Sequence, residues 1–358
     1  MSKLFTPVQI GRYELSNRLV MAPMTRSRAS DADGVPFDEV ATYYEQRSGA
    51  GLIISEGVYP SASGKGYVST PGIETEAQIA AWKKVTHAVH ARGSRIFMQV
   101  MHCGRISHPS MQPGNALPVA PSAIKPAGQT WTATGQQDFV TPHELTVAEI
   151  KGVVESYRLA TRRAIEAGFD GVELHAASGY LPEQFLASGS NRRTDEYGGP
   201  IGNRIRFVLE VLQAMVAEAG GGRVGIKISP EMNFNDILDE NPQALYWELV
   251  EQLNLFDLAY LQMTRQGTPE IDYHALLRSR FKGTYLMGAG LDQAKAETAL
   301  EAGKADAAVF GELFLANPDL PDRFQRGAPL NTPDRSTYYG GDAKGYVDYP
   351  VLQATEAA

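Results

Sequence analysis

FDGVELHAASGYLPEQF, residues 169–185, is the stretch from which we interpret the rest of the chain. It begins with residues 169–174, a mostly apolar run that predicts a buried β-strand. His175, Ser178 and Tyr180 follow, where the strand should give way to a loop or a short helix. An imidazole, a hydroxyl and a phenol offer the hydrogen bonds that the rim of an active site needs. A buried structural histidine and tyrosine would fit the same letters, so the rest of the sequence must decide.

Seven further apolar runs have the length of buried strands, and helical spacing of apolar residues follows most of them. The eight expected strands are residues 18–25, 51–56, 95–101, 169–174, 224–229, 258–264, 284–289 and 307–311. The expected helices are residues 38–48, 76–92, 147–167, 204–217, 242–253, 273–281, 292–302 and a last stretch around 321–326. Alternating strands and helices of this number predict the α/β class and a single parallel (β/α)8 TIM barrel. We expect residues 1–358 to form one domain.

Two segments fall outside this repeat. Residues 8–15 alternate around Gly11 and predict a small N-terminal β-hairpin before the main body. Residues 104–145 form a long loop after the third strand, rich in Pro, Gly and Ser and without a clear period. Irregular segments of this length in compact proteins are usually functional, so we expect a lid or a pocket wall there.

A doubly wound sheet is the competing architecture. It would have fewer strands and a glycine-rich dinucleotide fingerprint directly after the first one. Arg26-Ser27-Arg28 follow the first expected strand here, so the barrel is favoured.

The barrel also predicts where chemistry occurs, because barrel enzymes carry their active sites at the carboxyl ends of the strands. Those ends supply Pro23, Met24, Thr25, Glu56, Gly57, Gln99, His102, His175, Lys227, Ala289, Gly290 and Gly311. Most of these groups are neutral hydrogen-bonding groups or backbone, a poor set for a metal, and we expect no metal site even though His102, Glu173 and His175 could be imagined as ligands. Cys103 is best explained as a small buried thiol.

The ends of the last two strands are rich in glycine. Ala289 and Gly290 end the seventh strand and Gly311 ends the eighth, each before a helix. Loops at these two positions are the usual phosphate cradle of a barrel, since their N–H groups and the helix dipole attract anions. With amide, hydroxyl and phenol donors nearby, this suggests a cofactor with a phosphate tail and a flat polar ring.

Composition limits the possible partners and the location. The chain has 358 residues, is 43% hydrophobic and 21% charged, and has a formal net charge of −8, which argues against nucleic acid as a partner. Its one cysteine cannot form an intrachain disulfide. We see no signal peptide and no membrane-spanning run, and we expect a cytoplasmic monomer or small homo-oligomer that acts on a small molecule.

Several longer motifs resemble the Old Yellow Enzyme family of FMN-dependent ene-reductases, especially its N-ethylmaleimide reductase and nitrate-ester reductase branch. They are NRLVMAPMTRSRA at 17–29, AGLIISEG at 50–57, HAASGYLPEQF at 175–185, SNRRTDEYGG at 190–199, FGELFLANPDL at 310–320 and GYVDYP at 345–350. The resemblance runs nearly from end to end. It implies FMN as cofactor, NADPH or NADH as reductant, and reduction of activated alkenes such as α,β-unsaturated carbonyls, with nitrate esters or quinones as further substrates.

The resemblance also implies residue roles. FMN would be bound by Pro23, Met24, Thr25, Gly57, Gln99, His175, Lys227, Ala289, Gly290, Gly311, Glu312 and Tyr339. Substrate would contact Tyr67, Met101, His175, Ser178 and Tyr180, and Tyr339 would help to wall the pocket. The catalytic residues would be His175 and Ser178, which hold the substrate oxygen, and Tyr180, which gives a proton to the α-carbon after hydride reaches the β-carbon from flavin N5.

This chain departs from the family pattern at four of these positions. Ser178 stands where the family usually has Asn or His, and serine is the shorter donor. Lys227 replaces an arginine, so the cation remains but its two-pronged fork is lost. Glu312 replaces the arginine that pairs with the phosphate. Met101 stands where many relatives have tryptophan. Two alternatives follow: a barrel with weakened or lost FMN binding that acts as a binding or accessory protein, and an isomerase or dehydrogenase that uses the same FMN.

Overall fold

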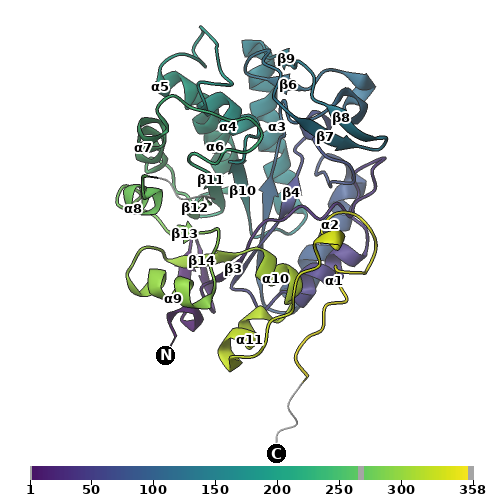
Figure 1. The fold of residues 1–358 in the computed structure, drawn as a ribbon, viewed down its shortest axis with the longest axis vertical. Coiled ribbons are helices and arrows are strands. Elements are labelled where there is room, and N and C mark those ends of the chain that lie inside the picture. Colours follow the sequence, from purple (N-terminus) through teal and green to yellow (C-terminus); the bar gives the residue numbers. More distant parts are fainter. Residues whose placement is uncertain (1, 265–269, 354–358) are drawn as a thin grey trace, which may run out of the picture.

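The computed structural model describes residues 2–264 and 270–353, and its centre is a closed barrel of eight parallel strands (Figure 1). In chain order the strands are β3 (Leu19–Met21), β4 (Leu52–Val58), β5 (Arg95–Val100), β10 (Gly171–Ala176), β11 (Val224–Ile228), β12 (Tyr260–Met263), β13 (Tyr285–Met287) and β14 (Ala307–Phe310). Each strand pairs in parallel with the next, and β14 pairs with β3 to close the ring. The predicted (β/α)8 barrel is confirmed.

Helices follow the strands and surround the barrel (Figure 1). They are α1 (Glu39–Gln46), α2 (Glu76–Ala91), α3 (Val147–Glu166), α4 (Leu181–Leu186), α5 (Ile201–Arg204), α6 (Arg206–Ala219), α7 (Pro242–Leu253), α8 (Tyr273–Arg278), α9 (Gln293–Glu301), α10 (Glu312–Ala316) and α11 (Leu320–Arg326). Capping boxes at Thr75 and Thr146 begin the two longest, because each threonine accepts a hydrogen bond from the third residue of its helix. None of the helices in the described ranges combines the length and apolar character needed to span a bilayer.

The predicted hairpin is present as β1 (Val8–Ile10) and β2 (Tyr13–Leu15). Ile10 and Leu15 pack with residues of the barrel interior, including Phe97, so the hairpin forms an apolar floor at the amino ends of the strands. Gly11 is required at the turn, since a Cβ atom there would lie 2.0 Å from the carbonyl oxygen of Gly222.

The loop after β5 lies where it was predicted but is more regular than expected. It contains an antiparallel hairpin, β7 (Gln129–Thr132) with β8 (Gly135–Asp138), and a short parallel pair, β6 (Val119–Ala120) with β9 (His143–Glu144). The sequence does not predict this hairpin, because its buried face consists of Thr130 and Thr132. Trp131 points outward and is 63% exposed. An alternation of this kind has no apolar run to reveal a strand.

The predicted end of the central strand is wrong by two residues, since β10 runs from Gly171 to Ala176 rather than over 169–174. Asp170 belongs to the preceding turn, where its carboxylate accepts a hydrogen bond from the backbone N–H of Ile96. His175 therefore lies within the strand, in register with Lys227 of β11.

The C-terminal segment runs beside α1 (Figure 1), and a cluster of arginine and tyrosine side chains fastens it there. Tyr43 and Tyr346 stack with ring centroids 4.2 Å apart, and the buried guanidinium of Arg26 lies over both rings. Arg26 also donates to the carbonyl oxygens of Tyr338 and Gly345. These contacts bring residues 337–346 to the carboxyl end of the barrel, next to the strand ends that the sequence marks as functional.

Candidate active site

The inward face of the strands changes from apolar to polar along the barrel. Phe97 of β5 and Tyr260 of β12 belong to the apolar floor. Because strand side chains alternate with a period of two, Gln99 and Gln262 face the same interior one step closer to the carboxyl ends. Glu173 of β10 lies at that level too, in register with Gln99.

Glu173 is a fully buried carboxylate within this polar layer. Its Oε1 accepts a hydrogen bond of 2.8 Å from Nε2 of Gln99. Burial raises the pKa of Glu173 to about 7, and the nearby charge of Lys227 opposes that rise. In the described part of the chain, Oε1 of Gln262 has no hydrogen-bond partner, so the layer offers this atom to a ligand or to water. Glu173 and the Tyr260 hydroxyl face each other, and their hydrogen bond lowers the pKa of Glu173 and raises that of Tyr260.

His175 is held as a neutral hydrogen-bond donor. Burial lowers its pKa and the charge of Lys227 lowers it further, so the imidazole is uncharged at neutral pH. Its Nδ1 accepts a hydrogen bond of 3.3 Å from the backbone N–H of Ala177. The proton therefore belongs on Nε2, which can donate to the oxygen of a bound molecule.

Ser178 is fixed by its backbone in the left-handed conformation, with φ 59°. Its N–H donates to Oγ of Ser229 at 2.8 Å, and its carbonyl accepts from Nδ2 of Asn235 at 2.8 Å. Its own hydroxyl lies 3.8 Å from the sulfur of Met232, a weak partner. These two backbone hydrogen bonds thus stabilise the strained conformation of Ser178, and its hydroxyl can still bind another acceptor.

Tyr180 stands edge-on to His175, with ring centroids 4.8 Å apart and an interplanar angle of 86°. Its hydroxyl lies 3.0 Å from that of Tyr67. Burial raises the pKa of Tyr180 well above its usual value, so the phenol keeps its proton at neutral pH. Two neutral proton donors, the imidazole of His175 and the phenol of Tyr180, therefore lie beside each other at one strand end.

The loop after β5 contributes to the wall around these donors, as the sequence predicted. Met101, Ile106 and Phe139 form a buried cluster with Tyr180, and Tyr67 packs against it. Cys103 belongs to the same cluster, and burial raises its thiol pKa, which confirms the interpretation as a buried thiol. The wall is apolar around the two phenols, which suits a small organic substrate.

Gly57, which is predicted to contact FMN, lies against Met101, which is predicted to contact substrate. A Cβ atom at Gly57 would lie 2.5 Å from Cε of Met101, so the methionine side chain packs directly against the glycine backbone. Pro23, Met24 and Thr25 follow β3 half-buried, and Met24 extends to the surface of Gly311. These positions therefore line one continuous edge, from β14 through β3 to β4.

The turn after β13 has the form of an anion cradle. Ala289 and Gly290 both adopt left-handed backbone angles, with φ of 71° and 67°. The angle is unusual for alanine, and a Cβ atom at Gly290 would meet only open space. Glu312, at the start of α10, accepts a hydrogen bond of 2.7 Å from the Tyr338 hydroxyl and lies 3.6 Å from Nη2 of Arg335. The carboxylate that replaces the family's arginine is thus engaged by the C-terminal segment.

Tyr339 is the predicted site residue least enclosed by the protein, since 70% of its surface is exposed. It contacts the ring of Tyr338 edge-on, and its charge state influences the pKa of Tyr67 and of Tyr180. It therefore lies at the open rim of the site.

Sequence reasoning missed the residues that support Ser178 and Tyr180. Glu183, at the start of α4, accepts hydrogen bonds from Gly179 N–H, Ser229 Oγ and the Tyr246 hydroxyl. Asn235 holds the Ser178 carbonyl, and its side chain also forms a hydrogen bond that lowers the pKa of Tyr67. The available signal was polar residues in apolar surroundings, Glu183 within LPEQF and Ser229 at the end of VGIKIS.

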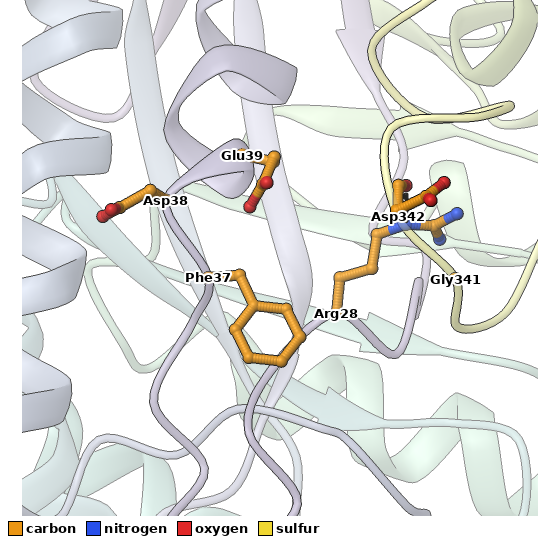
Figure 2. A pocket seen from close by; sticks show the side chains of 6 residues that line it. All are labelled: Arg28, Phe37, Asp38, Glu39, Gly341 and Asp342. Carbon is orange, nitrogen blue, oxygen red and sulfur yellow. Dashed lines mark hydrogen bonds between the residues drawn. The ribbon is translucent and has the colours of Figure 1, made fainter.

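A separate hollow of about 410 Å³ lies between the start of α1 and the C-terminal segment (Figure 2). It is lined by Arg28, Phe37, Asp38, Glu39, Gly341 and Asp342, none of which is a predicted site residue. No three His, Cys, Asp or Glu side chains within residues 2–264 and 270–353 are grouped as a metal site would require.

The barrel mouth combines a glycine-rich turn, buried amide and carboxylate groups, a lysine and two neutral proton donors, and a family match assigns this arrangement to the flavin-dependent oxidoreductases. The model of the NADH:flavin oxidoreductase / NADH oxidase family matches residues 3–331, and the chain belongs to this family. It is an FMN-dependent NAD(P)H oxidoreductase of the Old Yellow Enzyme type.

Curated relatives and solved structures agree with this assignment. The chain is 45% identical to putative 12-oxophytodienoate reductase 3 of Oryza sativa subsp. japonica, over 98% of this chain and 93% of the relative. It is 42% identical to 12-oxophytodienoate reductase 2 of Arabidopsis thaliana, over 98% and 96%. The structure of morphinone reductase in complex with tetrahydroNAD superposes with a TM-score of 0.94 and 47% identity, covering all of both chains. The Old Yellow Enzyme homologue from Zymomonas mobilis superposes with a TM-score of 0.95 and 38% identity, over 98% of this chain and all of that one. These matches give no support to an accessory barrel without FMN.

Glu183 makes a testable contribution to the pH dependence of stability. Burial raises its pKa from 4.5 to about 7, so the folded state binds this proton more tightly than the unfolded state. The resulting stabilisation is present below pH ~4.5 and is lost as the pH rises through ~7, at up to about 1.4 kcal/mol per pH unit. Glu183→Gln cannot titrate, so its free energy of unfolding should fall less than the wild type's between pH 5 and 8. Urea denaturation at constant FMN concentration measures this.

The exposed carboxylate Glu155 on α3 provides the control. Glu155→Gln should keep the wild-type slope over the same pH range. Parallel curves for the wild type and Glu183→Gln would contradict the raised pKa.

Proposed function

We propose that this enzyme reduces activated alkenes, above all α,β-unsaturated carbonyl compounds, with NADPH or NADH as the source of electrons. The observation that carries the proposal is the pairing of His175 and Tyr180, two neutral donors whose rings lie 4.8 Å apart. One donor suits the carbonyl oxygen of the substrate and the other suits its α-carbon. We further propose one FMN-binding domain over residues 1–358, as a cytoplasmic monomer or small homo-oligomer without nucleic-acid or membrane partners.

The residues present fit FMN. The buried Oε1 of Gln262, which lacks a partner within the described chain, and the Gln99 amide beside it suit the polar edge of a flavin ring. Open space at Gly290, next to left-handed Ala289, suits the phosphate. We propose that the ring is held by Pro23, Met24, Thr25, Gly57, Gln99, His175 and Lys227, and the phosphate end by Ala289, Gly290 and Gly311. Glu312 would lie beside the phosphate, and Tyr339 would lie against the cofactor at the wall of the substrate pocket. FMN, when bound, accepts hydride from the nicotinamide and supplies it to the substrate.

The chain's own residues then bind, polarise and protonate the substrate. Nε2–H of His175 donates to the carbonyl oxygen, and the Ser178 hydroxyl assists from the adjacent turn. These bonds draw electron density from the alkene and favour hydride addition at its β-carbon. Tyr67 and Met101 confine the substrate against Tyr180.

Tyr180 supplies the proton that completes the reduction. Addition of hydride at the β-carbon leaves an electron pair at the α-carbon, which takes the phenol proton. The phenolate that remains faces the Tyr67 hydroxyl at 3.0 Å, whose hydrogen bond stabilises it. His175 remains uncharged throughout.

Tyr180→Phe should separate the two half-reactions. The substitution keeps the ring and removes only the acid, so reduction of the enzyme by NAD(P)H should be nearly unchanged. Reoxidation by cyclohexenone should slow by about 10²–10⁴-fold, the usual contribution of a general acid. Reoxidation by a quinone needs no protonation of carbon and should survive. Rapid-mixing spectroscopy measures each step, and slowed flavin reduction with intact alkene turnover would refute the assignment.

His175 and Ser178 should differ in their contribution to oxygen binding. Phenols bound over a flavin give a charge-transfer absorption band, which reports their affinity. His175→Ala should abolish the band, because it removes the aligned Nε2 donor. Ser178→Ala should weaken binding less, because the serine hydroxyl is the shorter donor. Titration with a substituted phenol compares them, and equal losses would show that Ser178 is a full partner.

Glu312 should weaken FMN binding, because a carboxylate close to a dianionic phosphate repels it. The purified enzyme should therefore contain less than one FMN per chain unless FMN is added. Glu312→Arg should tighten binding by roughly 10- to 100-fold, as one charge-assisted hydrogen bond contributes about 1.5–3 kcal/mol. Flavin fluorescence quenching by the apoprotein gives the affinity.

Glu312→Gln removes the charge without adding a donor, so its affinity for FMN should lie between the wild type and Glu312→Arg. Weaker binding in both variants would mean that Glu312 acts through Tyr338 and Arg335 to close the site.

A further inference from the structure

The polar layer beneath the proposed flavin ring contains one carboxylate whose role the reaction above does not use. Glu173 is fully buried in β10, two residues before His175 and on the same interior face. The floor below it is apolar, with Phe97 and Tyr260 packed against Leu52 and Leu286. A charge in such surroundings persists only where partners compensate it.

The first partner of Glu173 is the Gln99 amide. The bond of 2.8 Å from Nε2 to Oε1 joins two residues that are already in register across β5 and β10. An amide is planar, so fixing one of its N–H groups also fixes the direction of its carbonyl oxygen. Glu173 therefore sets which atoms Gln99 presents to the ring.

The second partner is Lys227. The register of β10 with β11 pairs Glu173 with Gly225 and His175 with Lys227, which places the lysine one level above the carboxylate. Burial lowers the pKa of Lys227, and the charge of Glu173 raises it. Each charge thus opposes the effect of burial on the pKa of the other.

Few other charges act on this pair. The groups that influence the ionisation of Glu173 are Lys227 on β11, Gln99 on β5 and Tyr260 on β12. Burial and Glu173 itself raise the pKa of Tyr260, so that phenol stays protonated. His175 is neutral, with its pKa lowered by burial and by Lys227. Glu173 is consequently the group of the layer that exchanges a proton near neutral pH.

We propose that Glu173 is a positioning residue and a counter-charge for bound FMN: it orients Gln99, balances Lys227, and takes up a proton from solvent when FMN is reduced. Hydride from the nicotinamide brings two electrons and one proton to the ring. The added negative charge attracts Lys227 and disfavours the Glu173 carboxylate. Protonation of Glu173 then leaves Lys227 uncompensated beside the reduced ring. This proposal rests on FMN binding at the barrel mouth and needs no alkene substrate.

The test is the pH dependence of the midpoint potential of the holoenzyme, measured by spectroelectrochemical titration between pH 6 and 8.5. Uptake of one proton per two electrons gives a slope of about 30 mV per pH unit, and each further proton adds as much. The wild type should exceed that slope near pH 7. Glu173→Gln should remain at about 30 mV per pH unit throughout, while binding FMN within a few-fold of the wild-type affinity, because glutamine still accepts from Gln99.

Asp170→Asn is the matched control, a buried carboxylate just before the same strand but at the floor of the barrel, paired with Arg95 and His90. It should lower stability and leave the potential slope unchanged. Glu173→Leu removes the acceptor for Gln99 and should weaken FMN binding by at least tenfold.

Should the Glu173 variants fail to fold, the wild type still decides. Photoreduction in weak buffer with an indicator dye should show more than one proton taken up per FMN at pH 7. A wild-type slope of about 30 mV per pH unit, or a steep slope that persists in Glu173→Gln, would overturn the proposal. Absence of alkene reduction would bear on the proposed function and leave this result untouched.

Discussion

The parallel register of β10 with β5 and β11 is the constraint on which the site depends. It aligns Glu173 with Gln99 and His175 with Lys227, so that two levels of one strand carry two kinds of chemistry. A shift of one residue would turn these side chains toward the helices outside the barrel and bring Val172 and Leu174 inward. Packing on both faces of the strand excludes that shift. The same apolar contacts that stabilise the barrel therefore determine where a donor, a cation and a carboxylate meet.

Burial then sets the charge of each group in a predictable direction. It lowers the pKa of His175 and raises that of Tyr180, which leaves both neutral. It also raises the pKa of Glu173 and of Glu183 to about 7. Proton donors that carry no charge suit a pocket for uncharged carbonyl compounds, because entry of the substrate displaces no counter-ion. Lys227 lies at the level of His175, and the Glu173 carboxylate lies one level deeper, beneath the position proposed for the cofactor ring.

The sequence was most informative where a pattern is local. Eight apolar runs predicted the barrel, and strand-end positions predicted most of the candidate site. Contacts between distant segments were not accessible in the same way. Asn235 reaches Ser178 only because the loop after β11 folds over the end of β10, and no spacing within either segment encodes that distance. The β7–β8 hairpin, with threonine as its buried residue, shows a second limit, since burial of small polar side chains leaves no apolar signal.

The arginine and tyrosine cluster at the C-terminal segment has a consequence for the order in which the chain matures. Arg26 and Arg47 lie in the first strand–helix unit, and both are fully buried. Some of their acceptors, the carbonyl oxygens of Tyr338, Gly345 and Tyr346, are synthesised after all eight strands of the barrel. Until those residues leave the ribosome, the guanidinium of Arg26 lacks the partners that make its burial tolerable. The first strand–helix unit is thus completed by the C-terminal segment, and the barrel mouth matures only after residues 337–346 have been synthesised.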